Sequence, residues 1–309
     1  MKLLSVGDQI ERGSYTVHSR FRRAVNFSNG RHLVFLVSQE IGAGPLNIVL
    51  AGAGSQEALA CVSGVRAEEN FLQLDEQHFE LGFGDRYDSK LALRTRNTNC
   101  FAQNLEQFRR LLAETSPARS LAFLIAPERI GSFTSSIERA FISRIQCGVD
   151  EFFGGNLLEG VSLLKGCGMG LTPSGDDFIA GVLVGLQVVQ LLHERELGEA
   201  IDTIFRAAAG DNIFSKTFLD LARRGLVSEK QQNLILALSD EHPDALRGAA
   251  LNLFAVGATS GADFGTGFLM TLLEENGAVA RWNGEVGEAA KVNQLRDRSA
   301  RKIRAYGAI

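Results

Sequence analysis

The segment Gly166–Asp177, which reads GCGMGLTPSGDD, joins a glycine-rich turn to the start of a strongly apolar stretch. Thr172 is a good N-cap residue and Pro173 suits the first helical position, so a helix is predicted to begin here. The first N–H groups of a helix have no partner within it, and nearby glycines let a ligand approach the backbone closely. The segment therefore predicts a helix start that binds phosphate or carboxylate.

Two carboxylates modify this prediction. Asp176 and Asp177 suit the positive end of a helix dipole, but they repel a bare phosphate. A bound phosphate would need a cation such as Mg²⁺ held by these two residues, or the carboxylates would accept hydrogen bonds from an amide or ammonium group. The pattern favours a ligand with both anionic and N–H character and leaves the metal open.

A weaker copy of the segment follows at Ala258–Phe264, which reads ATSGADF. Five residues of the first copy recur at one constant offset: Ser174, Gly175, Asp177, Phe178 and Gly181 as Ser260, Gly261, Asp263, Phe264 and Gly267. Ordinary capping explains either helix start alone. It does not explain the shared Gly181 and Gly267, which predict two closely crossing helices at a pseudo-symmetric site.

Composition is typical of a soluble globular protein. The chain has 309 residues, of which 45% are hydrophobic and 22% charged, enough for two domains with a real core. A net charge of −4 without any basic run disfavours nucleic-acid binding.

No segment predicts secretion or a membrane span. The first residues lack the apolar region of a signal peptide, so a cytoplasmic location is expected. The apolar segment Phe178–Leu192 contains Gln187 and Gln190 and is shorter than the roughly 20 residues that a span requires. It is predicted to be a buried helix.

Cysteine and histidine spacing disfavours disulfides and transition-metal sites. The four cysteines form no C-x-x-C pair, and the five histidines are scattered, without an H-E-x-x-H pattern.

The hydrophobic period divides the chain into a β-rich domain, 1–97, and a mainly helical domain, 98–309, which predicts an α+β protein. Strands are expected at 24–27, 33–37, 46–50, 71–74 and 91–93, in an antiparallel barrel or sandwich. Hairpin turns are expected at Ser28–Gly30 and Gly42–Pro45. Helical stripes begin near residue 100 and continue through 133–147, 150–165, 195–209, 213–223, 229–239 and 244–256, with a polar helix face after Arg281. The segment Ser120–Pro127 fits either a strand or a buried helical turn.

The core GLTPSGDD at 170–177, with Ser215 and the run Ser260–Asp263 beyond it, resembles the AllH-like family. The segments Arg23–Phe27 and Gly44–Leu46 resemble the family's N-terminal part, so the resemblance covers most of the chain. It implies a subunit of oxamate carbamoyltransferase, which acts with AllF-type and AllG-type partner subunits in allantoin breakdown. The reaction converts oxalurate and phosphate to oxamate and carbamoyl phosphate, and this small anionic carbamoyl substrate has the mixed character predicted above.

On this hypothesis the catalytic residues are Asp176, Asp177 and Asp263, with Asp177 orienting the carbamoyl amide or a metal-bound water. The substrate-binding residues combine hydroxyl groups with open backbone: Gly168, Gly170, Thr172, Ser174, Gly175, Ser215, Thr259, Ser260 and Gly261. Backbone N–H groups near Gly168 to Gly175 would stabilise negative charge on the carbonyl oxygen. Ser215 is expected to cap its helix, either toward the same pocket or toward solvent.

Other candidates are weaker. Cys167 has no histidine or arginine nearby in sequence to activate it, and Ser174 lies outside a G-x-S-x-G elbow. Lys165 precedes the glycine turn and could reach a phosphate, but the loop lacks the P-loop pattern. Arg22, Arg23 and Asn26 fit exposed strand polarity better than anion binding.

Two rival hypotheses remain. The chain is a non-catalytic interaction subunit whose β domain docks onto catalytic partners, or it is a stand-alone hydrolase that uses the three aspartates around Mg²⁺ or Mn²⁺.

Overall fold

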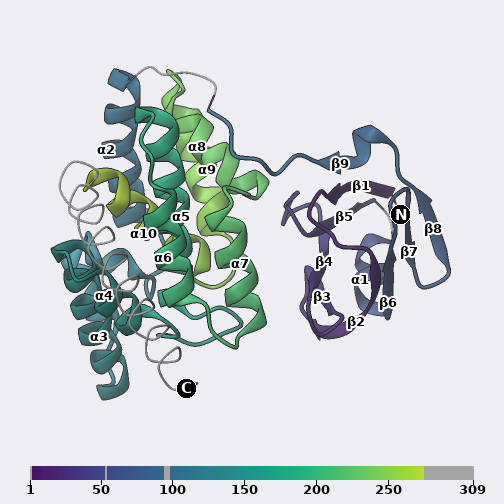
Figure 1. The fold of residues 1–309 in the computed structure, drawn as a ribbon, viewed down its shortest axis with the longest axis horizontal. Coiled ribbons are helices and arrows are strands. Elements are labelled where there is room, and N and C mark those ends of the chain that lie inside the picture. The colour runs from purple at the N-terminus through teal and green to yellow at the C-terminus, as the bar shows by residue number, and fades with distance from the viewer. Residues whose placement is uncertain (1, 53, 94–97, 275–309) are drawn as a thin grey trace, which may run out of the picture.

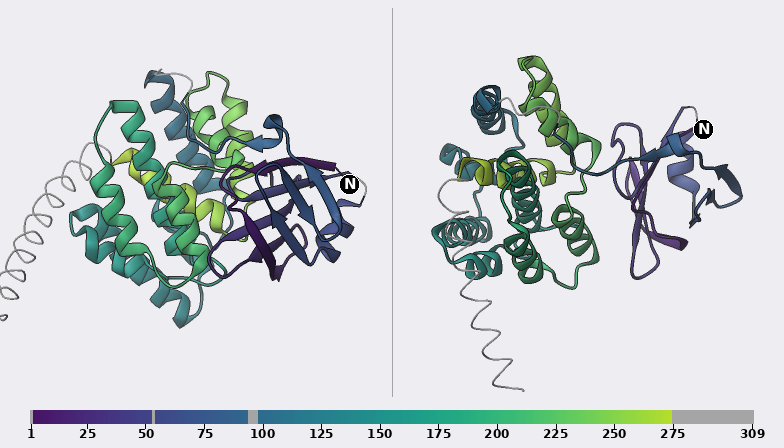
Figure 2. Two further views of the ribbon diagram at one scale, coloured as in Figure 1. Left: turned by 45° about the vertical axis from the view of Figure 1, so that its right-hand side comes forward. Right: turned by 45° about the horizontal axis from the view of Figure 1, so that its top comes forward.

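The computed structural model describes residues 2–52, 54–93 and 98–274. In these ranges a curled β-sheet precedes a helical domain, so the predicted α+β class is confirmed. Figure 1 shows the sheet beside the helices, joined by an extended segment after β9. The turned views in Figure 2 agree that the sheet lies on one side of the helices only.

The described strands form one sheet in the order β8-β7-β6-β2-β3-β4-β5-β1-β9. Most neighbouring strands are antiparallel, whereas the pairs β4–β5 and β1–β9 are parallel. The curl encloses an apolar core that the short helix α1 (Ser55–Cys61) helps to close. The strands are β1 (Lys2–Gly7), β2 (Gly13–Arg20), β3 (Ala24–Ser28), β4 (Leu33–Ser38), β5 (Asn47–Ala51), β6 (Gly64–Ala67), β7 (Phe71–Leu74), β8 (Gln77–Glu80) and β9 (Arg86–Tyr87).

The helices predicted from the 3.6-residue period are confirmed in the described part of the chain; the polar face expected after Arg281 lies outside it. The segment after Ser120 is a short 3₁₀ turn, not a strand. The helical elements are α2 (Thr98–Thr115), the 3₁₀ turns η2 (Leu121–Leu124) and η3 (Pro127–Ser132), α3 (Ser136–Gly154), α4 (Leu157–Leu164), α5 (Ser174–His193), α6 (Gly198–Ala208), α7 (Ile213–Arg223), α8 (Glu229–Leu238), α9 (Pro243–Phe254) and α10 (Ser260–Leu273).

One predicted hairpin is confirmed and one is wrong. Antiparallel β3 and β4 meet at Ser28–Gly30, where Gly30 has a φ of 85°. The segment Gly42–Pro45 does not form a hairpin, because β4 and β5 are parallel. It instead contacts the helical domain: the Ala43 N–H donates to Glu229 at the start of α8, at 2.9 Å. A local turn pattern cannot reveal this distant partner.

The strand predicted at 91–93 is also wrong. These residues belong to the connection between the domains, where the Leu91 N–H donates to the Gly225 carbonyl at 2.8 Å. A second hydrogen bond joins the same two segments in the opposite direction: the Val227 N–H donates to the Ser89 carbonyl at 2.9 Å. Leu91 is apolar because it is buried against the helical core, not because it lies in a sheet.

Both faces of β4 are buried, which explains why its sequence is apolar from Leu33 to Val37 without alternation. Val34 packs inside the curled sheet, whereas its neighbour Phe35 belongs to a cluster shared with Phe214 of α7. The ring of Phe35 also stacks on Phe218 with centroids 5.6 Å apart. The strand thus joins the two domains through their side chains.

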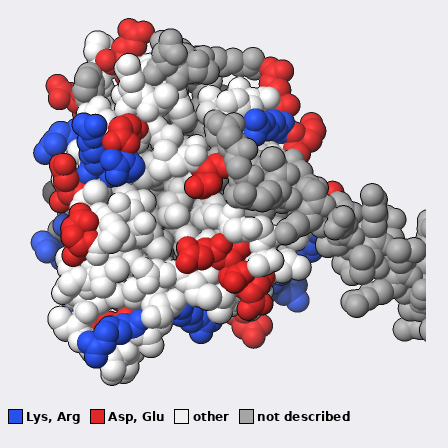
Figure 3. Space-filling view, turned by 90° about the vertical axis from the view of Figure 1, so that its left-hand side faces the viewer, with Lys and Arg blue, Asp and Glu red and all other residues white. Residues whose placement is uncertain are grey.

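The far side of the helical domain has a different character. Figure 3 views the molecule from the side on which α2, α3 and α4 lie in Figure 1, opposite the sheet. Charged side chains lie mainly around the margin of that face, and much of its visible middle has none.

Helices α5 and α10 form the centre of the helical domain. By length and composition α5 alone among the described helices would suffice to cross a membrane, but it is mostly buried in this domain. A Cβ on Gly181 would lie 2.0 Å from the Phe264 carbonyl oxygen, and a Cβ on Gly267 would lie 2.1 Å from that of Phe178. The predicted close crossing through these glycines is therefore confirmed.

The two central helices run parallel. Thr172, just before α5, lies beside Ser260 at the start of α10, and Gly185 farther along α5 lies beside Thr271. Their positive dipole ends are therefore adjacent, an arrangement that negative charge or hydrogen-bond acceptors stabilise.

We expect Gly181→Ala to destabilise the fold by about 1–3 kcal/mol or more, because the new methyl group overlaps backbone of α10. The matched control is Gly248→Ala at an exposed position of α9, where a Cβ meets nothing within 4 Å. That change should stabilise by about 0.5–1 kcal/mol, since alanine favours a helix interior. Urea denaturation of both variants measures the difference, and equal midpoints would contradict the close crossing.

Candidate functional site

The glycine-rich loop folds back over the start of α5. Gly166, Gly168 and Gly170 have φ values of 67°, 126° and 111°, as predicted for glycines that shape a turn. A Cβ on Gly168 would lie 2.6 Å from the Ser174 nitrogen, so only glycine allows this approach. The Gly166 N–H donates to the Asp176 carboxylate at 2.8 Å, which fixes the loop at its origin.

The prediction that Thr172 is the N-cap is wrong. Pro173 occupies that position with a ψ of 146°, and the helix begins at Ser174. The Pro173 carbonyl accepts the Asp177 N–H at 3.1 Å. The Thr172 hydroxyl instead donates to Asp177 Oδ2 at 3.1 Å, because the extended proline turns this side chain toward the interior of the first turn.

Both helix starts are closed by their own preceding loops. The Gly175 N–H donates to the Cys167 carbonyl at 2.8 Å, and its counterpart Gly261 donates to the Val256 carbonyl at 3.1 Å. Neither glycine tolerates a Cβ, which would overlap the carbonyl of Leu164 or of Leu253. These glycines therefore serve packing, and side-chain hydroxyls become the main donors near the carboxyls.

The two copies form a crossed set of hydroxyl and carboxyl groups. Asp177 of α5 lies beside the Ser260 hydroxyl of α10, and Asp263 of α10 lies beside the Ser174 hydroxyl of α5. The Thr172 and Ser260 hydroxyl oxygens are 3.5 Å apart, close enough to link the copies. Residues predicted from two distant segments thus meet in one place.

Burial raises the pKa of both carboxyls in this crossed set. The pKa of Asp177 is held well above 3.8 by burial and by the charge of Asp263, although the Ser260 and Thr172 hydroxyls lower it. Burial raises the pKa of Asp263 to about 6, although hydrogen bonds from the Leu121 N–H and from the Thr259 and Ser174 hydroxyls lower it. Both groups are therefore able to hold a proton at a higher pH than ordinary aspartates.

The three predicted catalytic aspartates differ in access. Asp263 is fully buried and Asp176 nearly so, whereas Asp177 keeps part of its surface exposed despite the protein around its carboxyl. Thr172 and Ser260 beside Asp177 are also partly exposed. Asp177 is therefore the least enclosed residue of the three aspartates.

Asp263 has a partner that sequence reasoning missed. Its Oδ1 accepts the Leu121 N–H at 2.6 Å, which ties α10 to η2. Its Oδ2 is buried and accepts no hydrogen bond of good geometry, even though the Ser174 and Thr259 hydroxyls are near. A main-chain donor carries no sequence signal, so nothing in the residue Leu121 indicated this contact.

Ser215 lies inside α7 and does not cap it. Asn212 is the cap, and its Oδ1 accepts the Phe214 and Ser215 N–H groups at 2.9 and 3.3 Å. Its Nδ2 donates to the Leu171 carbonyl at 2.8 Å, which attaches the glycine loop to α7. The Ser215 hydroxyl is buried without a partner among the described residues. Ser215 lies one helical turn before Leu219, so the two share a face of α7, and Leu219 belongs to the central core.

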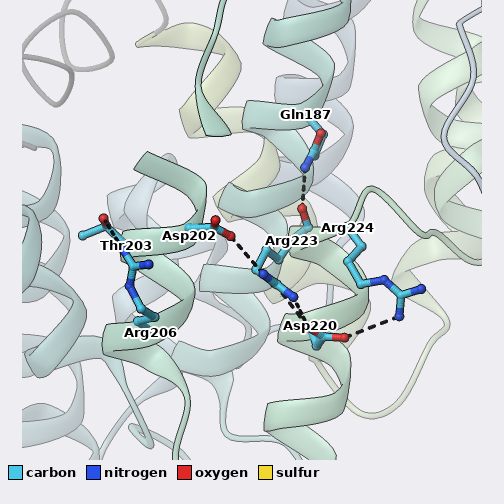
Figure 4. A network of polar contacts seen from close by, with 7 residues as sticks. All are labelled: Gln187, Asp202, Thr203, Arg206, Asp220, Arg223 and Arg224. Atoms are coloured by element: carbon cyan, nitrogen blue, oxygen red, sulfur yellow. Dashed lines mark hydrogen bonds and ion pairs between the residues drawn. The ribbon is translucent and has the colours of Figure 1, made fainter. Parts of the chain in front are cut away.

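The other end of α7 is anchored by ion pairs (Figure 4). Arg223 bonds Asp220 of its own helix at 2.7 Å and Asp202 of α6 at 3.0 Å. Its guanidinium also lies 4.6 Å from the ring centroid of Phe205, and its carbonyl accepts from Gln187 of α5. The helix that fixes the loop is therefore itself fixed at both ends.

The aspartates do not form an evident metal centre. Within the described residues, no group of three or more histidine, cysteine, aspartate or glutamate side chains is placed to hold a metal ion. Asp176 is engaged by Gly166, while Asp177 faces Thr172 and Ser260. The two adjacent carboxyls thus have different partners.

The weaker candidates have structural partners. The Lys165 ammonium donates to the Ala207 and Ala209 carbonyls at 3.2 and 2.7 Å, where it caps α6. Cys167 is buried, and burial raises the pKa of its thiol, so it is poorly suited to be a nucleophile.

Of the three N-terminal candidates, Arg22 and Arg23 are exposed as expected, whereas Asn26 is buried. Arg23 pairs with Glu40 at 2.8 Å, and the buried Asn26 donates to Ser19 at 3.0 Å.

Comparison with known families agrees with this geometry. A family model described as oxamate carbamoyltransferase subunit AllH matches residues 164–272, the range that contains both helix starts. A second, described as the AllH family N-terminal domain, matches residues 2–89, the curled sheet. The chain belongs to the AllH family. The predicted resemblance is thereby confirmed, and the family description makes the chain a carbamoyltransferase subunit. Comparison with curated proteins and with solved structures finds no significant match.

The raised pKa of Asp263 predicts a pH-dependent stability in this AllH-family chain. Between its ordinary pKa of 3.8 and its folded value of about 6, the folded state binds the proton and the unfolded state loses it. The free energy of unfolding therefore falls as pH rises through this window, by up to about 3 kcal/mol from this group. Asp263→Asn removes that contribution.

Urea denaturation at pH 4, 5, 6 and 7 measures the effect. The stability of Asp263→Asn relative to wild type should increase with pH. Asp150→Asn, at an exposed position of α3, should follow the wild-type pH dependence. Parallel curves for wild type and Asp263→Asn would show that Asp263 has an ordinary pKa.

Proposed function

We propose that this chain is the oxamate carbamoyltransferase subunit that binds the amide-bearing substrate, oxamate or oxalurate, at the paired starts of α5 and α10. The family description supports the transferase assignment. The observation that carries the location is the crossed set in which Asp177 and Asp263 lie among hydroxyls of both helices. Carboxyls accept amide N–H bonds and hydroxyls donate to carbonyl or carboxylate oxygens, so the set is complementary to oxamate.

The reaction requires a proton at the leaving nitrogen. A phosphate oxygen attacks the carbamoyl carbon of oxalurate, and the bond from that carbon to the oxamate nitrogen breaks. The nitrogen takes up a proton, so that oxamate and carbamoyl phosphate leave. Asp177 has a raised pKa and is accessible, which suits it to supply that proton as a general acid.

The neighbouring groups have supporting roles in this proposal. The Thr172 and Ser260 hydroxyls, 3.5 Å apart at the helix starts, stabilise negative charge on the carbonyl oxygen. Asp263 is buried against Leu121 and positions the start of α10. Asp176 holds the glycine loop through Gly166.

We further propose that the chain functions in the cytoplasm, in allantoin breakdown, with partner subunits of the AllF and AllG types. The family description as a subunit supports the existence of partners. Mg²⁺ is not needed to hold the amide end of the ligand, because the carboxyls bond it directly. The proposed amide site therefore binds oxamate equally well with and without this ion.

Calorimetric titration of oxamate into the purified chain tests the proposal. We expect saturable binding in which Asp177→Asn raises Kd by about tenfold, the scale of one lost hydrogen bond. Asp150→Asn, at an exposed position of α3, is the matched control and should leave Kd unchanged. Circular dichroism confirms that both variants are folded.

The same titration separates the rival hypotheses. Absence of heat with oxamate, both for the isolated chain and for the assembled subunits, would favour a non-catalytic interaction subunit. Binding that requires Mg²⁺ and disappears in Asp177→Asn would favour the metal-dependent hydrolase.

A further inference from the structure

The two loops that precede the central helices differ in one respect. The first loop is longer than the second and carries Met169 and Leu171, which are 94% and 38% exposed. The second loop, between Phe254 and Thr259, has no side chain larger than valine. The pseudo-symmetric copy thus shows that closing a helix start does not require an exposed apolar tip.

The exposed tip belongs to a well-fixed loop. Hydrogen bonds from Gly166 to Asp176, from Gly175 to Cys167 and from Asn212 to Leu171 attach the loop at its beginning, at its end and along its length. An exposed methionine on such a loop presents apolar surface in one defined place. Methionine adapts well to a partner's surface and is enriched in binding interfaces.

The adjoining site lacks positive charge. Besides burial, the groups that shift the pKa of Asp177 and Asp263 are hydroxyls, one backbone N–H and other carboxyls. No lysine or arginine of the described chain is among them. Two basic residues beside the loop, Lys165 next to Gly166 in sequence and Arg144 near Cys167, have other partners. Lys165 donates to the end of α6, and Arg144 donates to the Leu163 carbonyl at the end of α4, at 2.7 Å.

Among the described residues, phosphate at this site therefore lacks a cationic partner. A phosphate dianion beside two carboxyl groups needs cationic side chains, which bind it in bidentate or multiple hydrogen bonds. The Gly175 and Gly261 N–H groups at the two helix starts are used by their own loops, so these donors do not replace such side chains. The charge of this site is complementary to a basic surface.

We propose that a partner subunit docks on the tip formed by Met169 and Leu171 and places lysine or arginine side chains beside Asp177, where they bind phosphate. This inference rests on the proposed function and divides the site between two chains. The present chain holds the amide end, and the partner holds the phosphoryl end next to an apolar pocket for the tip.

Assembly tests the docking surface directly. The chain and its AllF-type and AllG-type partners are mixed, and the affinity is measured by sedimentation with wild type, Met169→Glu and Leu191→Glu. Leu191 is 43% exposed at the opposite end of α5 and is the matched control. Met169→Glu should weaken assembly by about tenfold or more, the scale of an interface hot spot, and Leu191→Glu should leave it unchanged. Equal affinity for wild type and Met169→Glu would overturn the docking assignment.

Phosphate binding tests the divided site. Calorimetry with inorganic phosphate should give no saturable heat with the isolated chain and saturable heat with the assembled subunits. Phosphate binding by the isolated chain as tight as by the complex would overturn the division. Isolated Met169→Glu should still bind oxamate like wild type, which shows that its amide site is intact. Failure of oxamate to bind in any sample would refute the proposed function, while the sedimentation result would still decide the docking surface.

Discussion

Two backbone carbonyl oxygens determine the arrangement of the helical domain. Those of Phe264 and Phe178 occupy the space that a Cβ on Gly181 and on Gly267 would fill, so α5 and α10 approach each other more closely than side chains permit. The helices are parallel, and this contact brings their first turns together. The hydroxyls of one copy then reach the carboxyls of the other, which lie where two positive dipole ends meet.

Much of this arrangement was predictable because it repeats in the sequence. The glycines two turns beyond each helix start predicted the crossing, and the pairing of serine with aspartate predicted a shared site. The contacts that escaped prediction involve the main chain: the Leu121 N–H that meets Asp263, and the N–H groups of Gly175 and Gly261 that their own loops use. A backbone group is the same at every residue, so sequence gives no sign of its partner.

The sheet illustrates another limit of local patterns. The run of apolar residues in β4 correctly predicted a strand, and burial on both faces explains the absence of alternation. The glycines at Gly42 and Gly44 resembled a hairpin, but contacts with α8 direct that segment back so that β5 runs parallel to β4. The segment there contacts a residue, Glu229, that lies far along the chain.

The first turn of α7 connects these two halves of the molecule. Asn212 holds the glycine loop through the Leu171 carbonyl, and two residues later Phe214 packs against the sheet beside Phe35. A rotation of the sheet relative to the helices would pull on this turn and so displace the loop. The position of the sheet and the geometry of the glycine loop at the start of α5 therefore depend on each other through a single helical turn.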